Sequence, residues 1–144
     1  MNFNLRLKEL LDEQEISARK LCEQIGIDHT SIYMYLQGGY PNLENAVKIA
    51  NYFDCTLNFL FCIDELPNQY KFFYEYNAGL FFKRYTDLLR LNKISHYKVG
   101  KELKLGNSTF KKWQSGCIPK IETLTKLSKY FGYSIDYLVG RSDT

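Results

Sequence analysis

The chain is 144 residues long, with 45% hydrophobic and 24% charged residues, which is the composition of a folded protein of one ordinary domain or two very small ones. No stretch approaches the roughly 18 consecutive apolar residues of a membrane helix, and the N-terminal segment lacks the apolar region of a signal peptide, so we expect a cytoplasmic protein with no membrane partner. The formal net charge of +3 is unevenly distributed, because residues 1–64 carry 5 basic and 9 acidic side chains whereas residues 79–144 carry 13 and 5. This imbalance favours a polyanionic partner for the second half.

The first half of the chain has the apolar spacing of helices throughout. Leucines spaced three and four apart predict a helix over 3–14, and Ser17 is a suitable N-cap for a second helix over 18–25. Gly26 allows a left-handed turn, after which Asp28 is placed to cap a third helix over 29–36. The same reasoning predicts a fourth helix over 43–53 and a short fifth helix that is capped by Thr56 and contains Leu57 and Leu60.

The second half repeats this plan. Helices are expected over 79–92, 96–103, 107–114, 121–131 and 135–140, with Ser95 and Ser134 as N-caps of the second and fifth and Asn107 or Ser108 as the cap of the third. Lys104 stands where the first half has its turn glycine, so we expect that corner to be formed by a side-chain-bearing residue at a modest cost in backbone strain.

An internal repeat relates the two halves. A shift of 78 positions aligns residues 5–63 with 83–141 without gaps and with 13 identities in 59 pairs. Tyr35 aligns with Trp113 on the apolar face of the third helix, and we expect both in the core. A repeat of this length is too long for a solenoid unit and indicates two small domains, over 1–64 and 79–144, joined by an aromatic linker over 65–78.

The linker is rich in aromatic residues rather than in Gly and Ser. Tyr70, Phe72, Tyr74 and Tyr76 alternate with the period of a strand, whereas Phe73 would face the other way. The pattern favours an aromatic connector between the two domains. The alternative is a short strand or extended arm that pairs with a second copy of the chain and makes a homodimer.

Each half resembles a Cro/cI-type, lambda-repressor-like helix-turn-helix domain of the XRE family. The resemblance rests on residues 16–60 and, more strongly, on residues 94–140, where TFKKWQSG, IPKIETL and YFGYSIDYLVG stand at the places typical of the family. It implies an all-α fold of two five-helix domains in tandem and a sequence-specific DNA-binding regulator, resembling the small repressors of phages and bacteria. In such a motif the second helix crosses the phosphate backbone, and the third lies in the major groove of double-stranded DNA.

The second half has the richer set of candidate DNA contacts. The positions expected to face DNA carry groups that bind phosphates or base edges, namely His96, Tyr97, Lys98, Asn107, Ser108, Thr109, Lys111, Lys112 and Lys120.

The first half is acidic, and its corresponding positions are Arg19, Lys20, His29, Thr30, Ser31 and Tyr33. Duplex phosphates repel a negative surface, although the hydroxyl-bearing side chains are able to bond bases. The sequence therefore leaves two roles open for this half, contact with DNA or assembly into a homodimer or with a protein partner.

A second class of function is a protein-interaction or antitoxin-like module on the same scaffold, because a fold does not establish a function. An enzyme is disfavoured, since the sequence has no nucleophile–base arrangement and no phosphate-binding glycine loop. No cofactor is implied. The four cysteines include no CxxC pair and the only histidines are His29 and His96, so we expect no metal site, and buried, reduced thiols.

Overall fold

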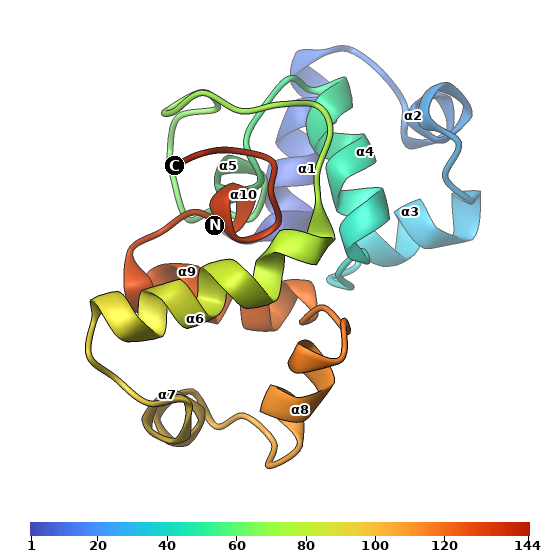
Figure 1. The fold of residues 1–144 in the computed structure, drawn as a ribbon. Coiled ribbons are helices and arrows are strands. Elements are labelled where there is room, and N and C mark those ends of the chain that lie inside the picture. The colour runs from blue at the N-terminus through green and yellow to red at the C-terminus, as the bar shows by residue number, and fades with distance from the viewer. The chain divides into compact units, whose positions relative to one another are not determined.

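The computed structural model describes all 144 residues as helices and their connections, with no strand. The chain divides into two compact units, Met1–Tyr74 and Glu75–Thr144, called here the first and second units. Figure 1 shows the five α-helices of each unit. Those of the first are α1 (Phe3–Glu13), α2 (Ala18–Ile25), α3 (His29–Leu36), α4 (Leu43–Tyr52) and α5 (Leu57–Leu60). The second has a 3₁₀ turn (Ala78–Leu80) and α6 (Phe81–Leu91), α7 (His96–Leu103), α8 (Thr109–Gln114), α9 (Ile121–Phe131) and α10 (Ile135–Leu138).

The helices begin where the sequence places their caps. The hydroxyl of Ser17 accepts the backbone N–H of Lys20 at 3.1 Å, and the hydroxyl of Ser95 accepts that of Lys98 at 3.2 Å. Thr56 and Ser134 cap α5 and α10 in the same way. Such caps satisfy backbone donors that the first helical turn leaves without partners. Asp28 also stands at a cap position, but its side chain accepts no capping hydrogen bond.

The core of each unit is built from one apolar face of every helix. In the first unit Leu7, Leu21, Ile32, Ile49 and Leu60 are fully buried. Trp113 of the second unit is 5% exposed and lies edge-on to Phe81 and Tyr85, and its counterpart Tyr35 is 3% exposed, which confirms the core positions expected for both. These cores hold the helices of each unit at fixed angles, because apolar side chains of this size stabilise by about 1.5–3 kcal/mol each when buried.

The backbone repeats with the offset found in the sequence. The residues with positive φ in the first unit are Glu15, Gly26, Gly38, Asp54 and Cys62, and those of the second unit are Lys93, Lys104, Gly116, Gly132 and Gly140. Every member of the first set lies 78 positions before a member of the second. An arginine–aromatic contact repeats as well, since Arg6 lies 3.8 Å above the ring of Phe59 and Arg84 lies 4.5 Å above that of Tyr137.

Residues 65–78 contain no strand within the chain itself, and a strand formed by pairing with a second copy stays a prediction. The backbone of Tyr74 is already engaged within the first unit, where its carbonyl accepts Asn51 Nδ2 at 2.9 Å and its hydroxyl donates to Asp54 Oδ1 at 2.7 Å. Pro67 likewise accepts the N–H of Thr56 at 2.9 Å. The segment up to Tyr74 therefore folds back on the C-terminal end of α4 and the start of α5.

The thiols are only partly buried. Cys22 and Cys55 lie in the core and Cys62 is half-buried, whereas Cys117 is exposed. The expectation of buried thiols is wrong for Cys117, because the left-handed Gly116 turns the chain outward after α8. All four cysteines are free.

The corner between α7 and α8 is strained at Lys104, as the sequence predicts. Lys104 has φ +57° and ψ +48°, the left-handed conformation that its counterpart Gly26 adopts with φ +70°. A side chain in this region costs about 1–2 kcal/mol, and the greater freedom of glycine in the unfolded chain offsets part of that.

We therefore expect Lys104→Gly to raise the free energy of unfolding of the second unit by about 0.5–1 kcal/mol. The measurement is urea unfolding followed by the fluorescence of Trp113, which is the only tryptophan and lies in the second unit. Lys104→Ala keeps a Cβ at this position, so an equal gain from that variant would contradict the strain argument.

Candidate nucleic-acid interface

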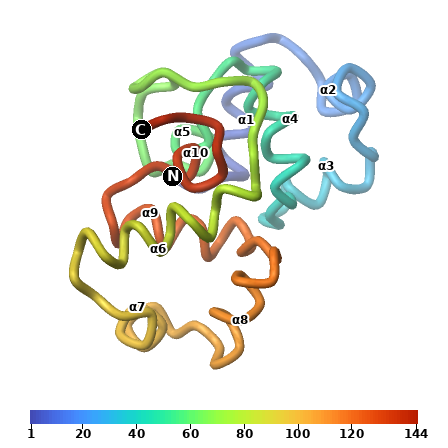
Figure 2. The backbone as a smooth tube through the Cα atoms, viewed as in Figure 1, coloured from blue at the N-terminus to red at the C-terminus, as the bar shows by residue number.

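In the first unit α2 and α3 form a helix–turn–helix pair, visible in Figure 2 as two short coils joined by the turn at Gly26. Leu21 of α2 and Ile32 of α3 are both fully buried and fix the angle between the two helices. The opposite face of α3 is therefore presented outward.

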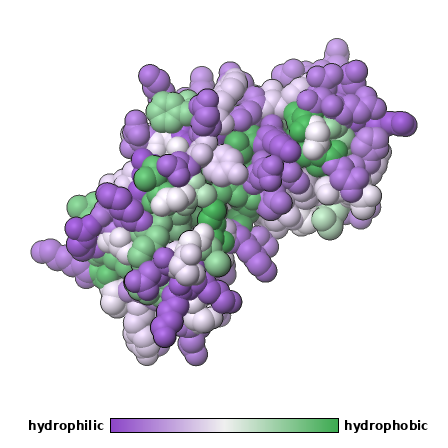
Figure 3. All heavy atoms as spheres, turned by 45° about the vertical axis from the view of Figure 1, so that its right-hand side comes forward, coloured by the Kyte–Doolittle hydropathy of each residue, from purple (hydrophilic) through white to green (hydrophobic).

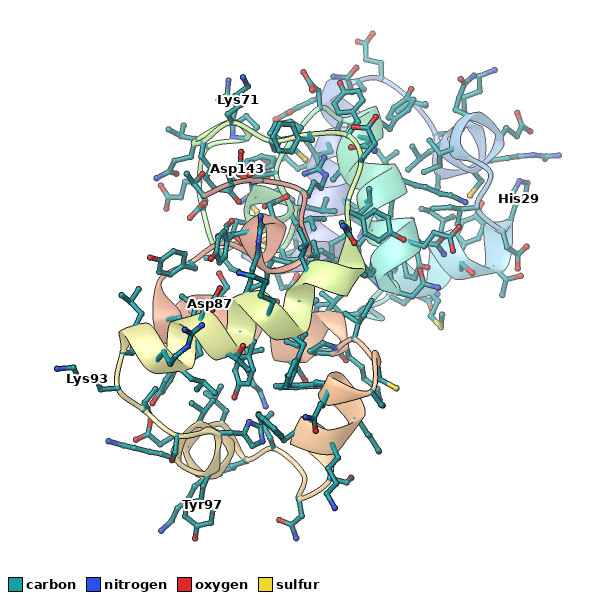
Figure 4. The ribbon with its side chains drawn as sticks, viewed as in Figure 1. His29, Lys71, Asp87, Lys93, Tyr97 and Asp143 are labelled. Carbon is teal, nitrogen blue, oxygen red and sulfur yellow. The ribbon has the colours of Figure 1, made fainter.

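The outward face of α3 carries polar and aromatic groups. His29 and Thr30 are exposed at its start, and the His29 ring points away from the unit in Figure 4. Tyr33 is 52% exposed and Met34 53%, whereas Ser31 is half-buried. Hydroxyl, imidazole and phenol groups on one helical face are able to donate to and accept from base edges.

The cations beside this face are few. Arg19 on α2 has its Nε 3.7 Å from the carboxylate of Glu23, one turn later, and both side chains are largely exposed. Lys20 is exposed and has no ion pair. The first unit thus offers groups that can form hydrogen bonds with base edges, but little positive charge to attract the phosphates of DNA.

The second unit presents the equivalent pair, α7 and α8 (Figure 2), and Lys104 is the residue that ends α7. Tyr97 is 77% exposed and points away from its unit in Figure 4, and Lys98 follows it on the same helix. Lys111 and Lys112 are exposed on α8. In the view of Figure 3 the side chains that project furthest from the surface are hydrophilic.

The start of α8 differs from expectation. The helix begins at Thr109 rather than at 107, so Asn107 and Ser108 lie in the preceding turn, where both are exposed. Ser108 makes no capping hydrogen bond; instead Thr109 is half-buried and its hydroxyl donates to the carbonyl of Gly106 at 2.6 Å. This bond holds the turn outside the helix and leaves the Asn107 and Ser108 side chains at its tip.

His96 is the predicted contact residue that the structure turns inward. Its Nδ1 lies 2.6 Å from the hydroxyl of the fully buried Tyr85, and its ring packs 4.9 Å from that of Phe110. One ring nitrogen is thereby engaged in the core, so His96 supports the position of α7 rather than projecting freely as Tyr97 does. Burial lowers the pKa of the His96 imidazole below its ordinary value of 6.5.

A pH dependence of stability follows from His96. Because its pKa is lower in the folded than in the unfolded chain, the unfolded state binds the proton first as the pH falls. The stabilisation is complete above 6.5, the ordinary pKa, and declines as the pH falls below it. We expect the second unit to unfold at a lower urea concentration at about pH 5.5 than at about pH 7.5, as reported by Trp113 fluorescence. His96→Gln should reduce this difference, whereas replacement of the exposed His29 should leave it unchanged.

Several cations of the second unit's face were missed by sequence reasoning. Lys104 and Lys126 line one cavity together with four residues expected to contact DNA, which are Ser108, Thr109, Lys112 and Lys120. Lys101 lines a second cavity with His96, Tyr97 and Asn107. The excess of lysines over carboxylates between residues 93 and 129 could have indicated a basic surface in the sequence. Which of these lysines lie next to each other depends on the fold.

No group of three His, Cys, Asp or Glu side chains is arranged to hold a metal ion. None of the helices is long and apolar enough to span a bilayer.

Comparison with known proteins identifies the first unit more clearly than the second. The helix-turn-helix family model matches residues 7–60. An HTH-type transcriptional activator, BcrR of Enterococcus faecalis, is 33% identical over 67 residues, which are 46% of this chain; the chain spans about a third of the length of that relative, since the match covers 33% of it. No solved structure shows a significant match. The family match lies in the first copy, and the resemblance of residues 94–140 stays a prediction.

Proposed function

We propose that this protein binds double-stranded DNA at specific sequences and regulates transcription, and the match of residues 7–60 to the helix-turn-helix family model supports this. The observation that carries the proposal is the α2–α3 pair, whose buried Leu21 and Ile32 leave Thr30 and Tyr33 on an outward face. A helix held in this way enters the major groove with its N-terminal residues toward base edges. The similarity to a transcriptional activator supports the same class of function.

We further propose that the second unit is a second helix-turn-helix domain that also contacts DNA. Support comes from the matched positive-φ positions and from the exposed Lys98, Lys111 and Lys112, none of which has a carboxylate partner. Neutralising phosphates with lysines releases counterions and supplies most of the non-specific affinity for duplex DNA. In this proposal the second unit supplies attraction and some reading, through Asn107 and Ser108, and the acidic first unit supplies reading.

The direction of regulation stays a prediction, repressor-like by the resemblance of the sequence, whereas the relative in Enterococcus faecalis is an activator. A homodimer formed through residues 65–78 or through the first unit also stays a prediction, as does the alternative of a protein-interaction or antitoxin-like module.

The experiment is selection of bound duplexes from a random pool by the purified chain at about 0.15 M salt, followed by sequencing. Two enriched half-sites at a fixed spacing would support reading by both units or by a dimer. One short motif would restrict reading to one unit. Absence of enrichment would contradict sequence-specific binding and favour the protein-partner function.

The contribution of the second unit is tested by Lys111→Ala with Lys112→Ala. If both lysines meet phosphates, the double variant should weaken binding to every duplex and lower the slope of log K against log salt by about 1–2. Lys93→Ala with Lys129→Ala removes two exposed lysines outside α7 and α8 and is the matched control. Unchanged binding by the Lys111/Lys112 variant would contradict docking of α8 on DNA.

A further inference from the structure

A cavity of about 450 Å³ lies beside α8 in the second unit, bordered by the turn before this helix, the turn after it and the first half of α9. Four lysines line it, Lys104, Lys112, Lys120 and Lys126, and no aspartate or glutamate does. None of these four ammonium groups has an ion pair with a carboxylate of the unit. Unpaired like charges around one cavity repel each other, and an anion in the cavity would remove that repulsion.

The rest of the lining is suited to a phosphorylated organic molecule. The hydroxyl-bearing residues Ser108 and Thr123 stand among the lysines, and the half-buried Leu105 and the exposed Ile118 contribute apolar surface. The volume falls within the range of about 300–1,000 Å³ that is typical of small-molecule sites. Cationic and apolar lining together fit a ligand that has phosphates at one end and an apolar or aromatic group at the other.

The first unit lacks these features at the corresponding positions. Seventy-eight residues earlier stand Gly26, Met34, Asn42 and Lys48, so three of the four lysines are absent. The turn after α3 also lies directly on Met34, because a Cβ added to Gly39 would come within 2.9 Å of the Met34 side chain. The lysine-rich lining is thus particular to the second copy and not a necessity of the repeated fold.

The start of α9 also differs from the start of α4, its counterpart in the first unit. In α4 the Asn42 side chain accepts the N–H of Asn45 at 2.8 Å and so caps the helix. In α9 the cap position is occupied by Lys120, which makes no capping hydrogen bond. The only acidic side chain in the first turn is Glu122, which is exposed and does not line the cavity. The first backbone N–H groups of this 11-residue helix therefore receive no hydrogen bond from the side chain at the cap position.

We infer that this cavity binds a small organic polyphosphate of nucleotide size, with its phosphates among Lys104, Lys112, Lys120 and Lys126 and its apolar part against Leu105 and Ile118. The same lysines lie on the face proposed to meet DNA, so an occupied cavity would compete with duplex phosphates. Binding of the small ligand stands independently of the proposed function, whereas the competition rests on it.

The test is titration of the purified full chain, without DNA, with inorganic tripolyphosphate, ATP and adenosine at about 0.15 M salt. Trp113 lines the cavity and is the only tryptophan, so its fluorescence reports on the site. We expect saturable changes with tripolyphosphate and with ATP, tighter binding of ATP because it adds an apolar contact, and no change with adenosine alone. Lys112→Gln with Lys120→Gln should weaken both ligands at least about tenfold, since two of four charges are lost.

Lys93→Gln with Lys129→Gln is the control with the same loss of charge outside the cavity, and it should change the affinities by less than about twofold. Equal loss in both double variants would indicate attraction to a basic surface in general and would overturn the proposal. Absence of any saturable change in the wild-type chain would overturn it as well. A final arm adds duplex DNA: displacement of ATP supports competition, whereas DNA binding that ATP never affects rejects the competition and leaves the cavity's ligand standing.

Discussion

Thr30→Ala with Tyr33→Ala is expected to abolish discrimination between the selected duplex and a random one. Thr30 is exposed at the start of α3 and Tyr33 is 52% exposed one turn later, so neither contributes much to the core. Each lost contact to a base edge costs about 1–3 kcal/mol, so the loss of two should lower affinity for the selected sequence by about 30-fold or more. Affinity for random duplex should change little, because it depends on cations and neither residue carries charge.

The measurement is competition of the two duplexes for the variant at one fixed salt concentration. Tyr52→Ala is the matched control, since Tyr52 is 37% exposed at the C-terminal end of α4, away from the α2–α3 pair. An equal loss of affinity for selected and random duplexes would mean that α3 touches the backbone only. Full retention of discrimination would assign the reading to the second unit.

Asp136→Ala is expected to lower the free energy of unfolding of the second unit by about 3–5 kcal/mol, enough to unfold most domains of this size at moderate temperature. The Asp136 carboxylate accepts Arg141 Nη1 at 2.7 Å, and both side chains have no solvent exposure. Removal of the carboxylate leaves the guanidinium charge buried without its counter-charge, which costs more than the pair itself contributes.

The first unit supplies the control for this prediction. Its corresponding residues are Asn58 and Ile63, which are uncharged, and Asn58 is 5% exposed. The backbone bond is the same in both units, from Ile63 N to Asn58 O and from Arg141 N to Asp136 O, each at 2.8 Å. Asp136→Asn with Arg141→Ile should therefore recover most of the stability lost by Asp136→Ala, as measured by urea unfolding. A double variant as unstable as the single one would show that the charges are required.

The helices and their caps could be predicted because they depend on local chemistry. Ser17 and Ser95 cap the helices that follow them, and Gly26 and Lys104 make the same left-handed turn, as a repeat offset of 78 requires. Tyr35 and Trp113 lie on apolar stripes that can be recognised in the sequence from the 3.6-residue period of an α-helix. The start of α8 was predicted less well than the caps. The helix begins at Thr109, two residues after the predicted start at 107, because the Thr109 hydroxyl donates to the carbonyl of Gly106 and holds the preceding turn out of the helix.

By itself the sequence determined the helical class, the repeat and the helix-turn-helix resemblance. These features depend on the spacing of apolar residues, on helix caps and on turn residues, all of which act over a few neighbouring positions of the chain. Only the tertiary structure decided what depends on distant residues meeting. It turned His96 inward to Tyr85, buried Asp136 against Arg141, and folded Tyr74 back on Asp54 in place of a strand. It also gathered Lys104, Lys112, Lys120 and Lys126 around one cavity, because the angle between packed helices, and not the spacing of lysines along the chain, sets where their charges converge.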